Sequence, residues 1–586
     1  MVSVASRYPL SVACVAIVAV LAGCNRSGSP ATTAHTTPTV ATATAPVAWP
    51  AFVEQFIETY FVAYPSFAAG QGRHEFDGLL PDWSAAGIQK EIERLQQVRA
   101  KALQYTDATL TPQQRFQRGY LIGQIDDNLF WLRDARMPFT NPAYYFDNGL
   151  DPGTYVTVPY APADVRLRAF IKYAAAIPGA VEQIRANLQT PMPRSFVDYG
   201  VAGFSGFAEF YRKDVPQAFA EVADPQLQRQ LQDAIEPAAT AMQEMAKWLE
   251  AQRTTANDAY ALGKDRFAAM LSMTEAVNTP LDKLAAIGKA DLDRNLAALA
   301  EACKAYLPKG TLAACVDKQS QDKPHGGAVE GARSQLAQLR QFVVDHKIVT
   351  IPGTQLALVE EAPAYKRQNS MYISIPGPYE SNLPSIYYIA PPDPGWSKAE
   401  QLAYIPGKAD LLFSSVHEVW PGHFLQFLHS NRSSWRFGQL FVGYGFAEGW
   451  AHYAEELMVE EGLAQGSPEL HIGQLTNALL RNVRYMCAIG LHTQGMSVAQ
   501  CEQMFKEKAF VDGGNARQQA ARGTYDPAYL NYTMSKLMIF KLRKDWQAKN
   551  PQKTLQQFHD ELLSYGGPPI ALVRAQMLGE VGGELF

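Results

Sequence analysis

Apolar residues along most of the chain recur at the three- to four-residue spacing of an α-helix. In the clearest stretch, six apolar residues share one face of a single helix: Leu281, Leu284, Ala285, Leu292, Leu296 and Leu299. Thr279 is suited to cap this helix, and Pro280 to occupy its first position. The same spacing recurs in two earlier stretches, at Ile88, Ile92 and Leu95 and at Phe52, Phe56 and Tyr60. The pattern therefore predicts a mainly α fold.

One region, between Ile348 and Pro392, departs from this pattern. It contains short runs of β-branched and aromatic residues, MYISI from Met371 and SIYYIA from Ser385, separated by clusters of Pro and Gly. Such runs predict a small β-sheet. The sheet directly precedes the segment richest in chemically reactive residues. It is either one wall of an active-site cleft, where an edge strand can pair with an extended peptide, or a structural hairpin.

The first 24 residues have the pattern of a targeting segment. Arg7 precedes an apolar run from Leu10 to Leu21 that is short for a membrane-spanning helix. The run ends in the tetrapeptide LAGC, which resembles the lipobox of bacterial lipoproteins, where cleavage precedes a cysteine that is then lipidated. We therefore expect residues 1–23 to be a signal peptide and Cys24 to be the lipidated N-terminus. The alternative is an ordinary signal peptide with a chance cysteine.

A flexible linker and one large body are expected after Cys24. Residues 25–48 are almost entirely Ser, Thr, Ala, Pro and Gly, which bury too little apolar surface to offset the entropy of ordering. Residues 49–586 show no second linker, so we expect a single helical catalytic body, attached to a membrane only through the lipid. Asn25 after the cysteine is similar to Gram-negative lipoproteins of the outer membrane, facing the periplasm, within the bacterial cell envelope.

Charge and cysteine content narrow the class of protein. The net charge of −5 provides no basic face for nucleic acid, so we expect no nucleic-acid partner. Beyond the signal peptide and Cys24, four cysteines remain, in closely spaced pairs. In an oxidising compartment they predict two disulfides, Cys303 with Cys315 and Cys487 with Cys501. A structural zinc site is the alternative, but it lacks any CxxC element.

Two histidines and a carboxylate lie within the seven-residue segment HEVWPGH, from His417 to His423. His417 and Glu418 look like the first half of a zincin site, in which the histidine binds zinc and the adjacent glutamate reaches the metal-bound water. In the usual HExxH motif the second histidine lies about 40° around the helix, whereas a six-residue separation turns it by about 240°. We expect Pro421 and Gly422 to break the helix and return His423 to the metal. Alternatively, His423 only caps or packs.

A second helical segment, FAEGWAHYAEEL from Phe446 to Leu457, presents Glu448, His452 and Glu455 on one face. Glu448 is the expected third metal ligand from a neighbouring helix. His452 is an alternative ligand or a partner of one, and Glu455 is suited to orient a ligating histidine.

Four segments together resemble the bacterial DUF885 family, whose members carry an HExxPGH motif and an EGWA helix. They are HEVWPGH, EGWAHYAEEL, RNVRYMCAIGLH from Arg481 and YDPAYLNYTMSKLMIFKLR from Tyr525. The resemblance implies a mostly helical fold similar to gluzincin-type zinc metallopeptidases of the thermostable carboxypeptidase and neurolysin groups. It also implies metal ligation by His417, His423 and Glu448.

The last two segments add polar residues on otherwise apolar helices. Arg481 and Arg484 are candidates to hold a substrate carboxylate in a bidentate fork, and His492 or Tyr529 to donate a hydrogen bond to an oxyanion. Each of these residue types also occurs in purely structural roles. Tyr532 and Lys536 lie in the same segment as Tyr529.

The expected activity is zinc-dependent hydrolysis of a peptide substrate, with Zn²⁺ as the cofactor and Glu418 relaying the proton of the reacting water. One alternative is a zinc amidase or esterase acting on envelope components. Another is a lipoprotein that binds a partner without turnover. Other catalytic classes lack support, because GYGFAEG at Gly443 lies outside any βαβ unit and no GxSxG or Walker motif occurs.

Overall fold

Helices dominate the computed structural model, which describes residues 47–363, 367, 370–380, 382–580 and 582–586. The expected signal peptide, Cys24 and the linker up to residue 46 lie outside the described residues. The description below concerns the unit Ala48–Phe586. Within the described residues, every helix is too short or too polar to cross a membrane.

The first group of helices follows the predicted apolar spacing closely. It comprises α1 (Trp49–Ala63), α2 (Pro65–Gly70), η1 (His74–Phe76), α3 (Ala85–Leu103), η2 (Asp107–Thr109) and α4 (Pro112–Leu129). Every apolar position singled out in α1 and α3 is buried. These side chains share a core with Phe437 and Phe441 from far along the chain. Burial of one face therefore ties the N-terminal helices to the C-terminal body.

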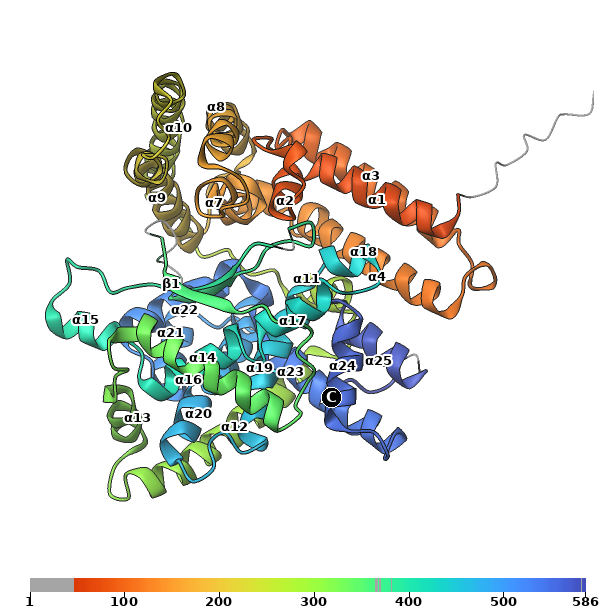
Figure 1. The fold of residues 1–586 in the computed structure, drawn as a ribbon, viewed down its shortest axis with the longest axis vertical. Helices are drawn as coiled ribbons and strands as arrows, with labels where there is room; N and C mark the ends of the chain where they lie inside the picture. Colours follow the sequence, from red (N-terminus) through yellow and green to blue (C-terminus); the bar gives the residue numbers. More distant parts are fainter. Residues whose placement is uncertain (1–46, 364–366, 368–369, 381, 581) are drawn as a thin grey trace, which may run out of the picture. The chain divides into compact units, whose positions relative to one another are not determined.

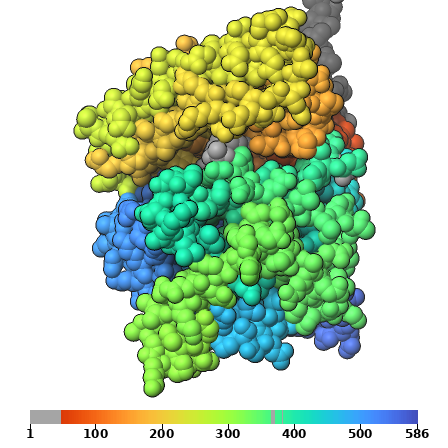
Figure 2. Space-filling view, turned by 60° about the vertical axis from the view of Figure 1, so that its left-hand side comes forward, coloured from red at the N-terminus to blue at the C-terminus, as the bar shows by residue number. Residues whose placement is uncertain are grey.

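The second group of helices follows α4 along the chain, and from α6 onward these helices share a core of their own. Its members are η3 (Phe130–Asp134), α5 (Met137–Thr140), α6 (Ala143–Tyr145), η4 (Phe146–Leu150), α7 (Gly153–Val156), α8 (Ala163–Asn187), α9 (Arg194–Ala218) and α10 (Pro225–Gln252). The long helices α8, α9 and α10 pack together around buried aromatic and aliphatic side chains. They form the upper layer of the unit in both views, above the green and teal segments (Figures 1 and 2).

The third group is the largest and carries the predicted chemistry. It begins with α11 (Lys264–Glu275), α12 (Leu281–Tyr306), α13 (Leu312–Gln321) and α14 (Gly327–Asp345), and continues after the sheet with α15 (Lys398–Tyr404), α16 (Lys408–Glu418), α17 (His423–Ser430), α18 (Arg436–Leu440) and α19 (Tyr444–Glu460). It ends with α20 (Pro468–Thr493), α21 (Val498–Lys508), α22 (Gly513–Tyr525), η6 (Pro527–Leu530), α23 (Asn531–Lys549), α24 (Leu555–Ser564) and α25 (Ile570–Leu578). One continuous core joins these helices except α15 and α18.

Helix α12 begins one residue later than the sequence predicts. Pro280 is the N-cap residue, with an extended backbone (φ −52°, ψ 141°), and no side chain caps the helix. Leu284, Leu292 and Leu299 are buried as expected, whereas the other three predicted positions are only partly buried.

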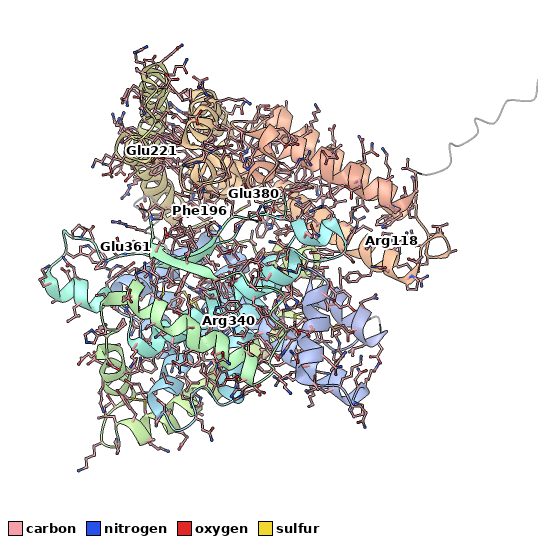
Figure 3. All side chains as sticks on the ribbon, viewed as in Figure 1. Arg118, Phe196, Glu221, Arg340, Glu361 and Glu380 are labelled. Carbon is pink, nitrogen blue, oxygen red and sulfur yellow. A yellow bond between two sulfur atoms is a disulfide. The ribbon has the colours of Figure 1, made fainter. Side chains whose placement is uncertain are left out.

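The predicted small sheet is confirmed and has three strands. They are β1 (Ala357–Glu361), β2 (Met371–Ser374) and β3 (Ser385–Ile389), in the order β1-β3-β2. Strand β3 pairs in parallel with β1 and antiparallel with β2, with Tyr387 opposite both Val359 and Ile373. Every residue of the central strand is buried. In Figure 1, β1 lies between α8–α10 above and α14 and α16 below, and Figure 3 labels Glu361 at its end.

Both predicted disulfides are present. Cys303 bonds to Cys315, linking α12 to α13, and Cys487 bonds to Cys501, linking α20 to α21. The two disulfides close short loops, with sequence separations of 12 and 14 residues. Because each bond lowers the entropy of the unfolded chain, each stabilises the folded protein by about 3 kcal/mol on the chain-entropy estimate.

Candidate functional site

The predicted break in the HEVWPGH segment is confirmed. Helix α16 ends at Glu418, and α17 begins at His423. Between them the backbone leaves the helical ladder: Trp420 N donates to Ser415 O (3.3 Å) and Gly422 N donates to Val416 O (2.9 Å). The Trp420–Pro421 peptide bond is cis. The chain therefore folds back onto the last turn of α16 instead of continuing along its axis.

Gly422 is the residue that permits this close return. A Cβ atom at this position would lie 1.7 Å from the carbonyl oxygen of His417, which no side chain tolerates. Because the turn is so tight, His423 comes back to His417, and their ring centroids are 4.7 Å apart at an interplanar angle of 87°. Two histidines that an ideal helix would hold on different sides thus face one another.

Glu448 of α19 completes a group of three converging side chains. Its Oε2 lies 3.3 Å from His417 Nε2 and 3.4 Å from His423 Nε2. Ligands about 2.1 Å from a tetrahedral zinc ion lie about 3.4 Å from one another. Glu448 Oε2 is buried and has no hydrogen-bond partner in the described part of the chain. The three donor atoms lie within 4.8 Å of one another, so their spacing and chemistry fit a zinc ion.

Two neighbouring residues of the EGWA helix explain how Glu448 reaches this place. Trp450 Nε1 donates a hydrogen bond to the carbonyl oxygen of Pro421 (2.8 Å), which fixes α19 to the turn between the histidines. At Gly449, a Cβ atom would lie 2.3 Å from that of Ser535, so glycine allows α19 and α23 to pack closely. Arg340 of α14, which is labelled in Figure 3, lies over the ring of Trp420, 5.9 Å from its centroid.

Glu455 orients His417 in the manner expected from the sequence. Its Oε1 lies 2.7 Å from His417 Nδ1, which leaves Nε2 facing Glu448. Arg481 pairs with the same oxygen at 3.0 Å. Although burial disfavours a charged carboxylate, Arg481 holds the pKa of Glu455 well below its usual range. When Nδ1 carries the ring proton and donates a hydrogen bond to Glu455, the Nε2 atom of His417 is left available as a metal ligand.

His452 lies one turn further along α19 and points into the core. It is fully buried, and neither of its ring nitrogens has a hydrogen-bond partner within the described residues. Its Nδ1 is 3.6 Å from Glu455 Oε2. Burial lowers the pKa of His452 to about 4. The group of converging donors contains Glu448 and not His452.

Opposite charges within this group of side chains stabilise one another. Burial opposes a charged His417, as does Arg481, but the Glu448 and Glu455 carboxylates outweigh both and raise the pKa of His417 to about 9. Burial also opposes a charged Glu448, yet His423 and His417 hold the pKa of this carboxyl well below its usual range. Glu448 is therefore ionised, as a metal ligand must be.

Glu418 stands beside the group without a partner of its own. It is partly exposed, and none of the described residues forms a hydrogen bond or ion pair with it. Burial, together with the nearby Glu418 carboxylate, raises the pKa of Tyr387 in β3. The small sheet therefore lies next to the end of α16.

The four remaining candidates separate into two pairs. Arg481 and Arg484 are both near the group: Arg481 contacts Glu455, and Arg484 lies over the ring of Tyr532. The structure does not bring His492 there. Its Nε2 lies 2.7 Å from the Gly523 carbonyl and its Nδ1 accepts from Leu262 N, so both ring nitrogens are occupied by backbone.

Tyr529 is also directed elsewhere. It is fully buried, and its hydroxyl lies 4.0 Å from Cys501 Sγ, next to the backbone of Gly523. A hydroxyl in this position faces a disulfide instead of the histidines. Neither His492 nor Tyr529 is therefore placed to donate to an oxyanion at the three-residue group.

Tyr532 is the residue that the sequence reasoning left without a role. Its ring lies parallel to that of His417 at 6.2 Å and edge-on to Tyr444 at 5.9 Å. Its hydroxyl has no hydrogen-bond partner among the described residues, and the nearby Glu448 charge, after burial, raises its pKa. The feature that distinguishes Tyr532 from Tyr529 is its place in the chain, because Tyr532 lies in α23 whereas Tyr529 lies in η6, directly before that helix.

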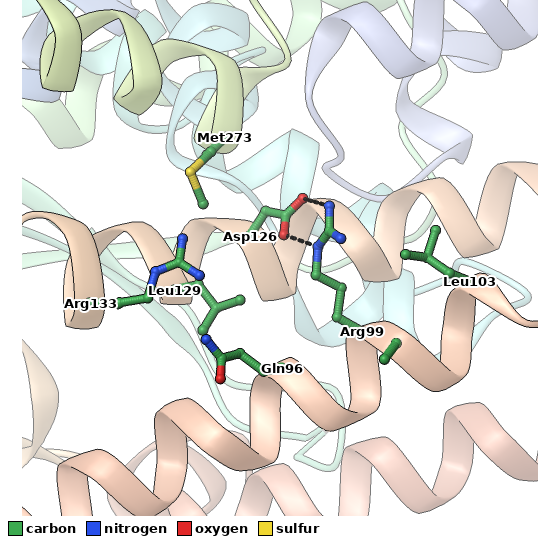
Figure 4. Close-up of a pocket in the computed structure, with 8 residues that line it drawn as sticks. Gln96, Arg99, Leu103, Asp126, Leu129, Arg133 and Met273 are labelled. Atoms are coloured by element: carbon green, nitrogen blue, oxygen red, sulfur yellow. Dashed lines mark hydrogen bonds and ion pairs between the residues drawn. The ribbon is translucent and has the colours of Figure 1, made fainter.

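A surface pocket of about 500 Å³ lies away from this chemistry, against α3, α4 and Met273 of α11. Arg99 donates two hydrogen bonds to Asp126 there (Figure 4). None of the candidate residues lines it.

Comparisons with solved structures support the fold. A candidate lipoprotein of unknown function from Shewanella oneidensis is 22% identical, with a TM-score of 0.74 over 91% of this chain and 100% of that one. A candidate lipoprotein from Colwellia psychrerythraea is 17% identical, with a TM-score of 0.76 over 91% and 98%. These identities show a shared fold alone.

A candidate oligoendopeptidase F from Bacillus anthracis str. Ames is 14% identical and covers 83% of this chain and 95% of its own, but its TM-score of 0.28 supports no conclusion. No curated protein matches the chain. The family model described as "Bacterial protein of unknown function (DUF885)" matches residues 65–577. The chain therefore belongs to the DUF885 family.

Proposed function

We propose that this protein is a zinc-dependent metallopeptidase. The observation that carries the proposal is the convergence of His417, His423 and Glu448 at the spacing of zinc ligands, with a buried carboxylate oxygen that lacks any other partner. Three protein donors leave the fourth position of a tetrahedral ion open, as in catalytic zinc sites. A zinc ion held there would polarise a carbonyl group and lower the pKa of a water molecule.

The surrounding side chains have separate roles in the proposed reaction. Glu418, at the end of α16 and free of other partners, takes the proton of the reacting water and passes it to the leaving amine. Tyr532 presents a hydroxyl without a partner, which can donate to the oxyanion in place of His492 or Tyr529. Glu455 and Arg481 hold His417 in orientation and take no part in proton transfer to the substrate.

Peptides are the favoured substrate because the sheet beside Glu418 has two edges. Strands β1 and β2 are the outer strands, and an extended peptide can add to such an edge through main-chain hydrogen bonds. An amidase or esterase acting on envelope components needs the same metal group. A binding protein without turnover does not need Glu418.

Metal analysis and peptide hydrolysis together test the proposal. We expect the purified protein to hold about one zinc ion per chain and to cleave members of a mixed peptide library, detected by mass spectrometry. Chelation should abolish cleavage, and added Zn²⁺ should restore it. Protein that holds no zinc after incubation with the ion, or a zinc-loaded protein that cleaves no peptide, contradicts the proposal.

We also propose that the protein is a lipoprotein of the bacterial cell envelope, attached to the outer membrane and facing the periplasm. The LAGC tetrapeptide supports this, and the two structures of similar fold carry the name of candidate lipoproteins. Replacing Cys24 by Ala should move the protein from the membrane fraction to the soluble fraction, since the lipid provides the attachment. Identical fractionation of wild type and variant contradicts the lipid anchor.

A further inference from the structure

Arg484 of α20 is a buried cation without a counter-ion. Only 8% of its surface is exposed. Its Nε donates to Gln519 Oε1 (2.8 Å), and no other hydrogen bond or ion pair joins it to the described residues. Its neighbours are differently satisfied, since Arg481 pairs with Glu455 and Arg522 with Asp526.

Positive charge and aromatic rings surround this guanidinium. Burial lowers the pKa of Arg484, and the neighbouring cations Arg522 and Arg481 lower it further, whereas Tyr532 and Tyr444 act in the opposite direction. A buried charge without a partner destabilises a folded protein, so such an arrangement persists where a ligand supplies the opposite charge. The planar guanidinium fork matches a carboxylate or a phosphate, and a peptide carries the first of these.

Arg484 lies close to the proposed zinc ligands. Its guanidinium carbon is 4.9 Å from the centroid of the Tyr532 ring, and that ring lies 6.2 Å from the ring of His417. One aromatic ring therefore separates the cation from the metal group. Consecutive Cα atoms of a peptide are about 3.8 Å apart, so a carboxylate on Arg484 belongs to a residue very near the bond being cleaved.

Side chains of α22 and η6 lie close to Arg484. Gln519 of α22 holds its Nε, and Tyr529, which is fully buried, lies near enough for Arg484 to affect its ionisation. Tyr199 of α9 stacks at 4.4 Å on Tyr525, the last residue of α22. Because only a small part of Arg484 is exposed, it is better suited to contact the end of a peptide chain than its middle.

We infer that Arg484 binds the C-terminal carboxylate of a peptide substrate, so that the enzyme removes residues from the C-terminus. The inference rests on the proposed peptidase function and names its substrate class. An aspartate or glutamate side chain offers the same carboxylate, and the experiment below separates the two sources. Arg481, occupied by Glu455, is assigned to positioning instead.

The kinetic test compares short peptides that differ only in having a free or an amidated C-terminus. We expect the wild type to cleave the free acids at their last bond and to act on the amides at least about 100-fold more slowly in kcat/KM. Arg484→Met should remove this preference by slowing cleavage of the acids alone. Amidated peptides with an internal Asp or Glu test the side-chain source, and efficient cleavage of these at the acidic residue overturns the inference.

Stability distinguishes a binding role from a structural one. Because Arg484→Met replaces an unpaired buried charge with an apolar side chain, the melting temperature should stay the same or rise. A marked fall would indicate a structural role and overturn the inference. Arg185→Met is the matched control: this exposed arginine also lies over an aromatic ring, that of Trp248 at 5.5 Å, and its loss should leave the acid preference unchanged.

Equilibrium binding separates failure of this inference from failure of the proposed function. The probes are N-acetyl-trialanine and its amide, titrated into zinc-treated Glu418→Gln protein by calorimetry. We expect the acid to bind at least about tenfold more tightly, and Arg484→Met to abolish the difference. If the wild-type protein cleaves no peptide but the Glu418→Gln protein still binds the acid more tightly than the amide, the peptidase function is overturned and the carboxylate site is kept. Equal binding of acid and amide would overturn the site even if peptides are cleaved.

Discussion

Glu418→Gln should leave zinc bound and the fold intact while lowering peptide hydrolysis by about two to four orders of magnitude. Glutamine has nearly the size of glutamate, but its amide cannot take up a proton at neutral pH. Glu418 makes no hydrogen bond or ion pair with the described residues, so the substitution breaks no structural contact. Zinc content and kcat measured on the same preparation provide the test.

Glu448→Ala is the matched control for that experiment. It removes a proposed ligand from α19 and should abolish both zinc binding and hydrolysis. His452→Ala, one turn along the same helix, should keep the zinc, because His452 lies outside the converging group. A Glu418→Gln enzyme with full activity would exclude the proton-transfer role, and zinc loss in His452→Ala but not in Glu448→Ala would move the ligand along the helix.

Periodicity predicted most of the architecture because burial of one helix face leaves a direct mark on the sequence. The apolar positions in α1 and α3 are buried, and the two runs rich in β-branched and aromatic residues became β2 and β3. Strand β1 had no comparable signal, since only one of its residues is buried. The break between His417 and His423 was also predictable, because geometry forbids a regular helix from joining them and Pro421 and Gly422 offered the means.

Side-chain direction after a break in a helix could not be predicted in the same way. Tyr529 and Tyr532 appear equivalent along the sequence, but Tyr529 lies in η6 and Tyr532 in α23, so the rotation between them is not that of one continuous helix. Only Tyr532 faces His417.

His492 shows a second limit. It is a polar residue on an apolar helix, but its partners are backbone groups of Leu262 and Gly523, far away in the sequence. Periodicity indicates which face of α20 is buried. It does not indicate whether backbone groups of an irregular segment lie against that face and form hydrogen bonds with a polar side chain. The same limit applies to Arg481 and Arg484, whose different partners appear only in three dimensions.

Gly422→Ala adds a single methyl group and should disrupt the convergence of the three proposed zinc ligands. The added Cβ would lie 1.7 Å from the His417 carbonyl oxygen and 2.4 Å from that of Val416, both of which belong to backbone that cannot rotate away. The turn must therefore open, which displaces His423 from His417 and separates two of the three donors. We expect loss of stoichiometric zinc, loss of hydrolysis and a lower melting temperature, with overpacking costing about 1–3 kcal/mol or more.

Gly206→Ala is the control that shows whether the effects of Gly422→Ala come from the turn between α16 and α17. Gly206 lies within α9, where an added Cβ meets nothing within 4 Å, so alanine there should keep zinc and activity and stabilise the protein by about 0.4–1 kcal/mol. His423→Ala completes the comparison, because it removes the ligand but leaves the turn free of strain. If Gly422→Ala retains zinc at wild-type affinity, the tight return of His423 onto α16 is not what assembles the site. If it loses zinc but His423→Ala does not, the turn positions another ligand and His423 is a packing residue.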